Sequence, residues 1–178
     1  MPKIIGICGS IGSGKTLVAD YLCAQHNFYK IKMASPIKDM LSAVGLTDNE
    51  LEGAKKEIEI DLLCGRSPRY AMQTLGTEWG RHIIGKDIWV NLWRNKAYNH
   101  IDMNLNVVAD DVRFHNEVEI IKEMGGKIIK LSRSSSTKSP HKSEELKFDV
   151  DINIDNNDSV YGLYSKVDSI IQDYDVIL

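Results

Sequence analysis

The stretch GSIGSGKT, from Gly9 to Thr16, directly follows the apolar run KIIGIC and holds three glycines and a lysine in eight positions. It matches the pattern G-x-x-x-x-G-K-[ST] without a mismatch. In that pattern the backbone N–H groups of a glycine-rich loop surround phosphate groups, and the following helix presents its N-terminus to the anion. An apolar, strand-like run precedes the stretch and a helical pattern follows it. The stretch therefore predicts a P-loop that binds a nucleoside triphosphate.

The residue types in this loop have distinct expected tasks. Lys15 would bridge phosphate oxygens, and the Thr16 hydroxyl would bind Mg²⁺. Glycines permit the required backbone angles and let a phosphate approach closely. The residues predicted to bind the triphosphate are Ser10, Gly12, Ser13, Gly14, Lys15 and Thr16. A P-loop alone is compatible with a kinase, a GTPase or an ATPase, so the rest of the chain must decide.

Outward from the loop, short apolar runs alternate with helical patterns. We expect strands at residues 3–8, 29–33, 106–110, 127–132 and 151–154, and helices at residues 15–24, 114–124 and 160–174. Apolar strands that alternate with helices indicate a parallel sheet covered on both faces. The sequence thus predicts an α/β fold, a three-layer sandwich around a five-stranded parallel sheet.

Two segments exceed this minimal pattern. From residue 36 to about residue 104 the pattern is helical, with interruptions at Gly45, at CGRSP and at Gly85, which predicts a helical insertion. From residue 133 to residue 145 the chain is polar and serine-rich without periodicity, which indicates a loop and equally suits a disordered surface segment. We expect a single domain of 178 residues, with its core at about 1–35 and 105–178.

Composition and charge narrow the class of protein. The chain is 43% hydrophobic and 26% charged, with a net charge of −3, which is ordinary for a soluble domain and argues against a nucleic-acid partner. Three widely spaced cysteines without a C-x-x-C pair favour free thiols in a reducing cytosol. We expect no signal peptide, because the glycine-rich turn interrupts the first apolar run, and no membrane span. The expected location is therefore the cytoplasm.

The segment PRYAMQTLGTEWGR, residues 68–81, is expected to form one helix with two stripes. Met72, Leu75 and Trp79 recur at helical spacing and should face the core. The second stripe consists of Arg69, Gln73, Gly76, Thr77 and Gly80. Because glycines destabilise a helix by about 1 kcal/mol each against alanine, close approach of a ligand would explain them. Alternatively, Arg69 and Gln73 form a surface pair and Gly80 marks a helix end.

The segment VVADDVRFHNE, residues 107–117, is a strand that ends in acids. Ligands of open α/β sheets collect at the carboxyl ends of strands. Asp110 or Asp111 would hold Mg²⁺ there, through water, and Arg113 would bind a phosphate with two hydrogen bonds. The alternative is a helix N-cap at Asp111 beside a solvated arginine.

The motifs GSIGSGKT, SPIKDML, RYAMQTLGTEWGR, DIWV, DDVRFHNE, HKSE and NNDSVYGLYSKV occur in this order. Together they resemble the bacteriophage deoxynucleoside monophosphate kinases of the P-loop nucleoside monophosphate kinase class, from residue 4 to about residue 171. The resemblance implies Mg²⁺-dependent phosphoryl transfer from ATP to a deoxynucleoside monophosphate. It also implies that residues 36–104 are an NMP-binding insertion and residues 133–148 a lid, which would close over both substrates and exclude water.

The same resemblance implies residue roles. Lys38, Arg69, Gln73, Gly76, Thr77, Trp89, Asp111, Arg113 and Glu117 correspond to residues that bind the deoxynucleotide. Arg133 begins the lid and is expected to bind ATP. The expected catalytic cations are Lys15, Arg113 and Arg133. In the lid, His141, Ser143 and Glu144 match the motif H-x-S-E. Trp89 equally suits a core position. The sequence departs from the family in its arginine-poor lid, since Arg133 is the only arginine between residues 132 and 149.

The expected partners are small nucleotides, with no nucleic acid and no membrane, and the resemblance suggests a homodimer. A phage-encoded chain would work in the host cytoplasm. One alternative is another small-molecule P-loop kinase, for a cofactor precursor or a sugar acid. A GTPase-like switch is a second alternative, but NND at residues 156–158 does not match the guanine-binding N-K-x-D pattern.

Overall fold

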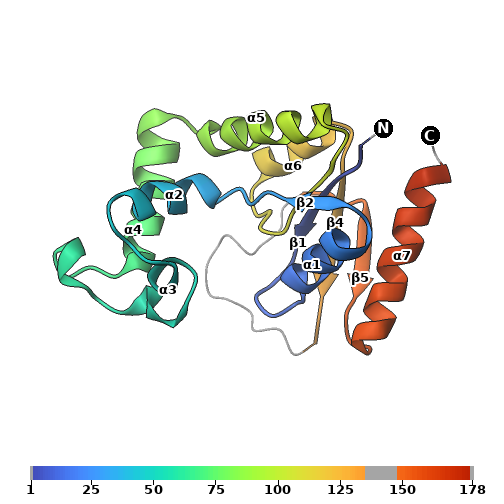
Figure 1. The fold of residues 1–178 in the computed structure, drawn as a ribbon, viewed down its shortest axis with the longest axis horizontal. Coiled ribbons are helices and arrows are strands. Elements are labelled where there is room, and N and C mark those ends of the chain that lie inside the picture. Colours follow the sequence, from blue (N-terminus) through green and yellow to red (C-terminus); the bar gives the residue numbers. More distant parts are fainter. Residues whose placement is uncertain (1, 135–147, 177–178) are drawn as a thin grey trace. The chain divides into compact units, whose positions relative to one another are not determined.

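The computed structural model describes residues 2–134 and 148–176, and the chain divides into two compact units (Figure 1). The sheet unit comprises Met1–Lys32 and Trp93–Leu178, and the helical unit comprises Met33–Leu92. The second boundary between the units falls inside a helix, α5 (Ile88–Asp102), and the insertion expected at residues 36–104 stays a prediction.

The sheet unit is built on five parallel strands in the order β2-β3-β1-β4-β5. Their bounds are β1 Ile4–Cys8, β2 Phe28–Lys30, β3 Asn106–Ala109, β4 Lys127–Ser132 and β5 Ile152–Asp155. The predicted five-stranded parallel sheet is thus confirmed. The predicted bounds of the second strand, 29–33, are wrong: only the Ile31 N–H continues the ladder, donating to the Val108 carbonyl at 2.9 Å, before the chain leaves the sheet.

Helices cover both faces of this sheet, as predicted (Figure 1). On one face α1 (Lys15–Gln25) and α7 (Val160–Val176) bury a common core, which includes Ile5, Ile7, Val18, Leu22, Val108, Ile129, Leu131, Leu163 and Val167. On the other face α6 (His115–Glu123) packs so closely that a Cβ on Gly6 would lie 2.7 Å from Ile121. Fully burying each such aliphatic side chain contributes about 1.5–3 kcal/mol to folding. This core therefore holds the strands, and with them their carboxyl ends, in fixed positions.

The helical unit is a series of short helices around a small apolar core. Its elements are α2 Ser35–Ala43, α3 Asp48–Leu51, η1 Ala54–Glu57, η2 Asp61–Leu63, α4 Pro68–Thr74 and η3 Leu75–Ile84. Leu41, Leu46 and Leu51 are buried there, and Met72 and Leu75 pack against them as predicted. No helix in the described part of the chain is both long and apolar enough to cross a membrane.

The predicted helix 68–81 changes character halfway. After α4 the chain continues as the π-helix η3, in which the Gly85 N–H donates to the carbonyl of Gly80, five residues earlier, at 2.9 Å. A π-helix has more residues per turn than an α-helix, so a stripe drawn at 3.6 residues per turn loses its register. Trp79, expected in the core, is instead 36% exposed and contacts the Trp89 ring.

Candidate active site

The P-loop connects the end of β1 to the start of α1. Gly12 and Gly14 have positive φ angles of 80° and 101°, which side chains with a Cβ rarely adopt. The Lys15 ammonium donates to the carbonyls of Gly9 and Ser10 at 2.6 and 2.7 Å. No described side chain caps the N-terminus of α1, and its first turn contains no acid. These first N–H groups therefore point an uncompensated positive dipole end toward the loop, as anion binding requires.

A residue from the other end of the chain supports this loop. Asn156, directly after β5, is 6% exposed; its amide Nδ2 donates to the Ser13 carbonyl at 2.8 Å and its backbone N–H donates to Ser132. A Cβ on Gly14 would lie 2.5 Å from that Nδ2 atom. Asn156 is thus a positioning residue for the loop. Asn156 begins the motif NNDSVYGLYSKV, but the sequence does not assign it this role, because only the folded sheet brings it beside residue 13.

Asp110 lies at the carboxyl end of β3 and is 4% exposed. Its Oδ1 atom is buried and has no hydrogen-bond partner in the described part of the chain. Leaving a buried acceptor unsatisfied costs about 1–3 kcal/mol, so this oxygen is a candidate ligand for a cation. Together with the exposed Thr16 hydroxyl at the start of α1, this oxygen suits Mg²⁺, which prefers oxygen ligands and keeps several waters.

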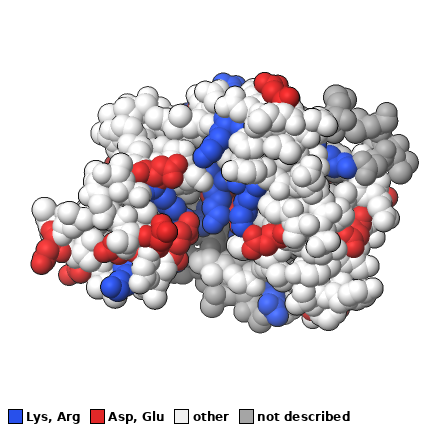
Figure 2. Space-filling model, viewed as in Figure 1, with Lys and Arg blue, Asp and Glu red and all other residues white. Residues whose placement is uncertain are grey.

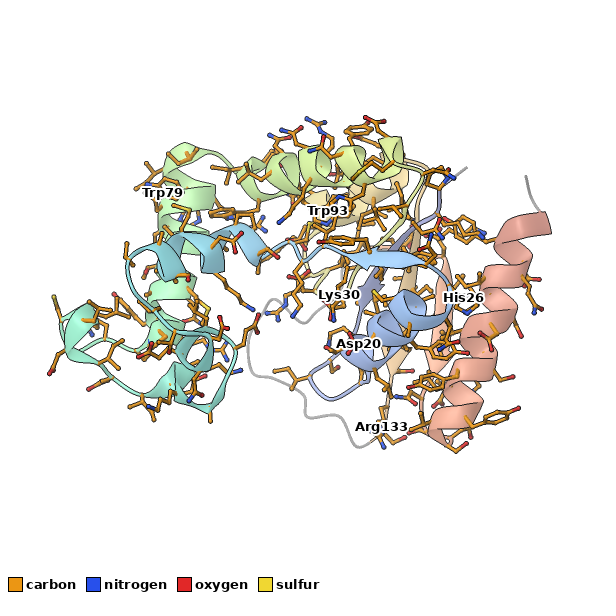
Figure 3. The ribbon with its side chains drawn as sticks, in the orientation of Figure 1. Asp20, His26, Lys30, Trp79, Trp93 and Arg133 are labelled. Carbon is orange, nitrogen blue, oxygen red and sulfur yellow. The ribbon has the colours of Figure 1, made fainter. Side chains whose placement is uncertain are left out.

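Further charges surround Asp110 on the neighbouring strand end. Lys30 of β2 forms an ion pair with Asp20 of α1, and the two side chains point toward one another in Figure 3. Burial opposes the charged ammonium, but Asp20 and Asp110 outweigh it, so the pKa of Lys30 is raised. Lys30 therefore stays charged and compensates part of the acidic charge at this edge, which the sequence pattern did not indicate.

Arg113 and Glu117 stand at the start of α6. Glu117 is 3% exposed, and its Oε2 atom accepts the backbone N–H groups of Arg113 and Phe114 at 2.7 and 3.0 Å. Its observed task is to hold the Arg113 peptide, and a direct contact with a nucleotide stays a prediction. The exposed Arg113 guanidinium has no ion pair with any residue that the structure describes.

A cavity of about 410 Å³ opens beside the P-loop, wholly within the sheet unit. Its described lining residues are Gly9, Ser10, Ile11, Lys15, Val112, Arg113, Lys130, Leu131, Ser132, Arg133, Ser134, Asp155 and Asn157. Four of them are basic and one is acidic, so the cavity favours a polyanion. Three of the four cations, Lys15, Arg113 and Arg133, are those proposed from sequence for phosphoryl transfer. The fourth cation, Lys130, was not among the residues proposed from sequence. Figure 3 shows Arg133 just beyond the end of β4.

The other predicted deoxynucleotide-binding cations lie in the helical unit and have acidic partners. Lys38 of α2 pairs with Glu52, and Arg69 of α4 donates from Nε to Glu57 at 2.8 Å. On the face drawn in Figure 2, acidic side chains gather over this unit and lie close to the few basic ones. The surface pair expected between Arg69 and Gln73 is therefore replaced by the pair with Glu57, while Gln73 and Thr77 are exposed.

Trp89 is 2% exposed within the helical unit. Its indole N–H donates to the Gly76 carbonyl at 2.8 Å, and a Cβ on Gly80 would overlap its ring. Gly80 therefore has a packing reason that needs no ligand, whereas a Cβ on Gly76 would lie 3.0 Å from the Cδ1 atom of Ile37. The core alternative describes the observed state of Trp89. A contact of Trp89 or Gly76 with a nucleotide stays a prediction.

Of the remaining predicted site residues, Asp111 is half-buried beside Asp110, and Ser10 and Gly12 lie in the P-loop. The lid residues His141, Ser143 and Glu144 lie outside the described residues. The described part of the chain holds no cluster of three or more metal-ligating side chains. This is compatible with Mg²⁺, which proteins commonly hold through one or two carboxylates and the substrate's phosphates.

Comparison with known proteins supplies the family. A family model described as deoxynucleotide monophosphate kinase matches residues 65–167. A protein of Acanthamoeba polyphaga mimivirus, provisionally named a deoxynucleotide monophosphate kinase, is 33% identical over 185 residues, which span 94% of this chain and 95% of that protein.

Solved structures of lower identity share the fold. The APS kinase of Mycobacterium tuberculosis in complex with AMPPNP and APS aligns with a TM-score of 0.52 at 10% identity, over 96% of this chain and 98% of that one. Shikimate kinase from Aquifex aeolicus aligns with a TM-score of 0.54 at 10% identity, over 95% and 96%. At such identities the likeness concerns the P-loop kinase fold alone.

Proposed function

Because the chain belongs to the deoxynucleotide monophosphate kinase family, we propose that it transfers the terminal phosphoryl group of ATP to a deoxynucleoside monophosphate. The family and the P-loop kinase fold support nucleotide kinase activity. The observation that carries the finer proposal is the cavity at the P-loop, in which Lys15, Arg113 and Arg133 converge from three different connections of the sheet. Such a site suits two phosphate-bearing substrates that meet end to end.

On the donor side, the P-loop N–H groups and the N-terminus of α1 bind the triphosphate of ATP. Lys15 exchanges its hydrogen bonds to the Gly9 and Ser10 carbonyls for phosphate oxygens. Thr16 and Asp110 are the residues that would hold Mg²⁺, which when bound neutralises phosphate charge and polarises the transferred group. Arg133, which lines the cavity, adds a further cation on the donor.

On the acceptor side, Arg113 binds the monophosphate. The second pKa of a phosphate monoester is about 6, so at neutral pH the acceptor is largely dianionic and needs no general base. An acceptor oxygen forms a bond to the terminal phosphorus of ATP as the bond to the bridging oxygen breaks and ADP leaves. Two unit charges 4 Å apart repel by about 4 kcal/mol at an effective dielectric constant of 20, so the site's cations chiefly offset this repulsion.

The helical unit supplies the remaining contacts of the proposal. Lys38, Arg69, Gln73, Thr77 and Trp89 would bind the sugar, base or phosphate of the deoxynucleotide. Glu117 acts through Arg113, whose peptide it holds. The homodimer stays a prediction that sedimentation of the purified protein would test.

The test is an ADP-release assay with ATP and Mg²⁺ against dAMP, dTMP, dGMP and dCMP. We expect turnover with at least one acceptor, and its loss when EDTA removes the metal. Lys15→Ala should lower kcat by about 1,000-fold, because it removes a cation that acts on the transferred group. Lys86→Ala, at an 85% exposed side chain, is the matched control and should retain full activity.

The proposal fails if the wild-type protein makes no deoxynucleoside diphosphate from any of the four acceptors. Turnover with a cofactor precursor or sugar acid in place of these nucleotides would support another small-molecule kinase. A preference for GTP without an acceptor would support the switch.

A further inference from the structure

Lys130 lies in the middle of the sheet unit, on β4, where neighbouring strands flank it. It pairs in register with Cys8 of β1 and with Asn153 of β5. Its neighbours Ile129 and Leu131 point into the core under α1 and α7, so its own side chain, in the alternation of a strand, points to the opposite face. There it lines the cavity beside the P-loop.

The other lysines near the sheet have local partners. Lys30 pairs with Asp20, Lys122 lies 3.4 Å from Asp151, and Lys166 lies 2.6 Å from Asp158. The Lys127 ammonium, three residues earlier on β4, lies over the Tyr174 ring at 4.3 Å. For Lys130, by contrast, the described residues offer neither a carboxylate nor a hydrogen-bond acceptor.

An ammonium that lines a cavity and has no described carboxylate beside it is available to an external anion. The only acidic residue among the described lining residues of the cavity is Asp155, whereas Lys15, Arg113 and Arg133 add to the positive charge. Burial raises the pKa of the Cys8 thiol, and the charges of Lys130 and Lys15 partly oppose this rise, which places both ammonium groups within electrostatic reach of the last residue before the P-loop.

The strand order defines which side of the loop Lys130 serves. β1, which leads into the P-loop, lies between β3 and β4. Arg113 follows β3 and Lys130 belongs to β4, so the two cations approach the loop from opposite flanks. With Arg113 assigned to the acceptor, the β4 flank remains for the donor.

We propose that Lys130 binds phosphate oxygens of the donor triphosphate on the β4 side of the P-loop, as a further substrate-binding residue of the site. The inference rests on the proposed function for its biological meaning, but it can be tested without turnover. Inorganic tripolyphosphate carries the donor's phosphate chain alone, so its binding measures this contact whatever the acceptor is.

The experiment compares wild type, Lys130→Met, Lys130→Arg and, as a matched control on the same strand, Lys127→Met. We expect Lys130→Met to weaken tripolyphosphate and ATP binding, measured by calorimetry, by about 10- to 100-fold, the range of a charge-assisted hydrogen bond. Lys130→Arg should recover most of this loss, and Lys127→Met should stay within about twofold of wild type. KM for the deoxynucleotide should change less than about threefold in Lys130→Met. Unchanged tripolyphosphate and ATP affinity in Lys130→Met would overturn the proposal.

A second measurement needs no variant and so does not depend on Lys130→Met folding. Wild-type protein is treated with an amine-reactive ester with and without tripolyphosphate, and the modified lysines are mapped by mass spectrometry. Tripolyphosphate should protect Lys130 and leave Lys127 unprotected. Equal modification of Lys130 in both samples would overturn the proposal, whereas absence of deoxynucleotide kinase activity in the wild type would count against the proposed function alone.

Discussion

The cations of the two units stand in contrasting surroundings. In the sheet unit, Arg113 and Lys130 line a cavity and have no carboxylate partner among the residues described. In the helical unit, Lys38 and Arg69 each meet a glutamate. A phosphate that enters the cavity therefore meets uncompensated charge, whereas one that approaches Lys38 or Arg69 must displace an acid. If the proposed function holds, we therefore expect the cations of the cavity to bind phosphate more tightly than Lys38 and Arg69 do.

The strength of the ion pairs in the helical unit follows from the solvent exposure of their glutamates. The side chains of Glu52 and Glu57 are 54% and 62% exposed, and ion pairs of this kind contribute about 0–1 kcal/mol. Displacing either glutamate therefore costs little free energy. The pairs orient the Lys38 and Arg69 side chains only weakly. By the same reasoning, removing a glutamate should have a small effect and removing Arg113 a large one.

Among the variants that test this contrast between the units, Arg113→Ala has the largest expected effect. Losing a two-pronged contact with the acceptor phosphate should raise KM for the deoxynucleotide about 30- to 100-fold and leave KM for ATP within about threefold. Arg69→Ala, in the already paired helical unit, is the comparison and should raise the same KM by no more than about 10-fold. Steady-state kinetics with each substrate varied would measure both. If Arg113→Ala left KM for every deoxynucleotide unchanged, the assignment of this site would be wrong.

A smaller effect of opposite sign is expected from Glu57→Gln. It removes the acid that competes for Arg69 and should lower KM for the deoxynucleotide by about two- to fivefold, in line with an exposed ion pair. Glu59→Gln, two residues away and also exposed, serves as the control. A rise in KM would show instead that Glu57 orients Arg69 for binding. It would contradict the expectation that the glutamates of the helical unit compete with phosphate.

The last comparison between the units concerns the reactivity of their cysteine thiols, which we expect to have no effect on activity. Burial raises the pKa of the Cys8 thiol from its ordinary 9.0 to about 11, whereas Cys64 of the helical unit is exposed. At pH 8 iodoacetamide should label Cys64 and leave Cys8 unmodified in the folded protein.

The stability consequence has a defined sign. Folded Cys8 keeps its proton above pH 9 while unfolded Cys8 loses it, so the free energy of unfolding should fall between about pH 9 and pH 11, by no more than about 2–3 kcal/mol. Urea denaturation of wild type and Cys8→Ala across this range measures the difference. An equal slope in both proteins would contradict the expected environment of Cys8.

Local patterns predicted the fold well. The P-loop follows from eight consecutive residues, and the strands of the sheet follow from short apolar runs bounded by glycines and acids. The end of β2 and the π-helix were not predictable in this way. Each depends on packing: the pairing of β2 with β3 ends where the chain leaves the sheet, and η3 accommodates the Trp89 ring against Gly80.

Sequence motifs single out candidate site residues where one element carries the whole pattern, and they do not single out residues that two elements bring together. Lys15, Arg113 and Arg133 stand in or beside sequence motifs, and the structure brings them to one cavity. Lys130 belongs to a mostly apolar strand. Its place beside the P-loop is visible only in the folded sheet, where β4 lies next to β1. The same holds for Asp20 and Lys30, whose ion pair joins α1 to β2.

The hydrogen bond from Asn156 to Ser13 spans 143 residues of chain. The loop is therefore synthesised well before the amide that supports it. A chain truncated before Asn156 would keep the whole glycine-rich motif but lack this support, so we expect such a chain to bind inorganic tripolyphosphate more weakly than the intact protein.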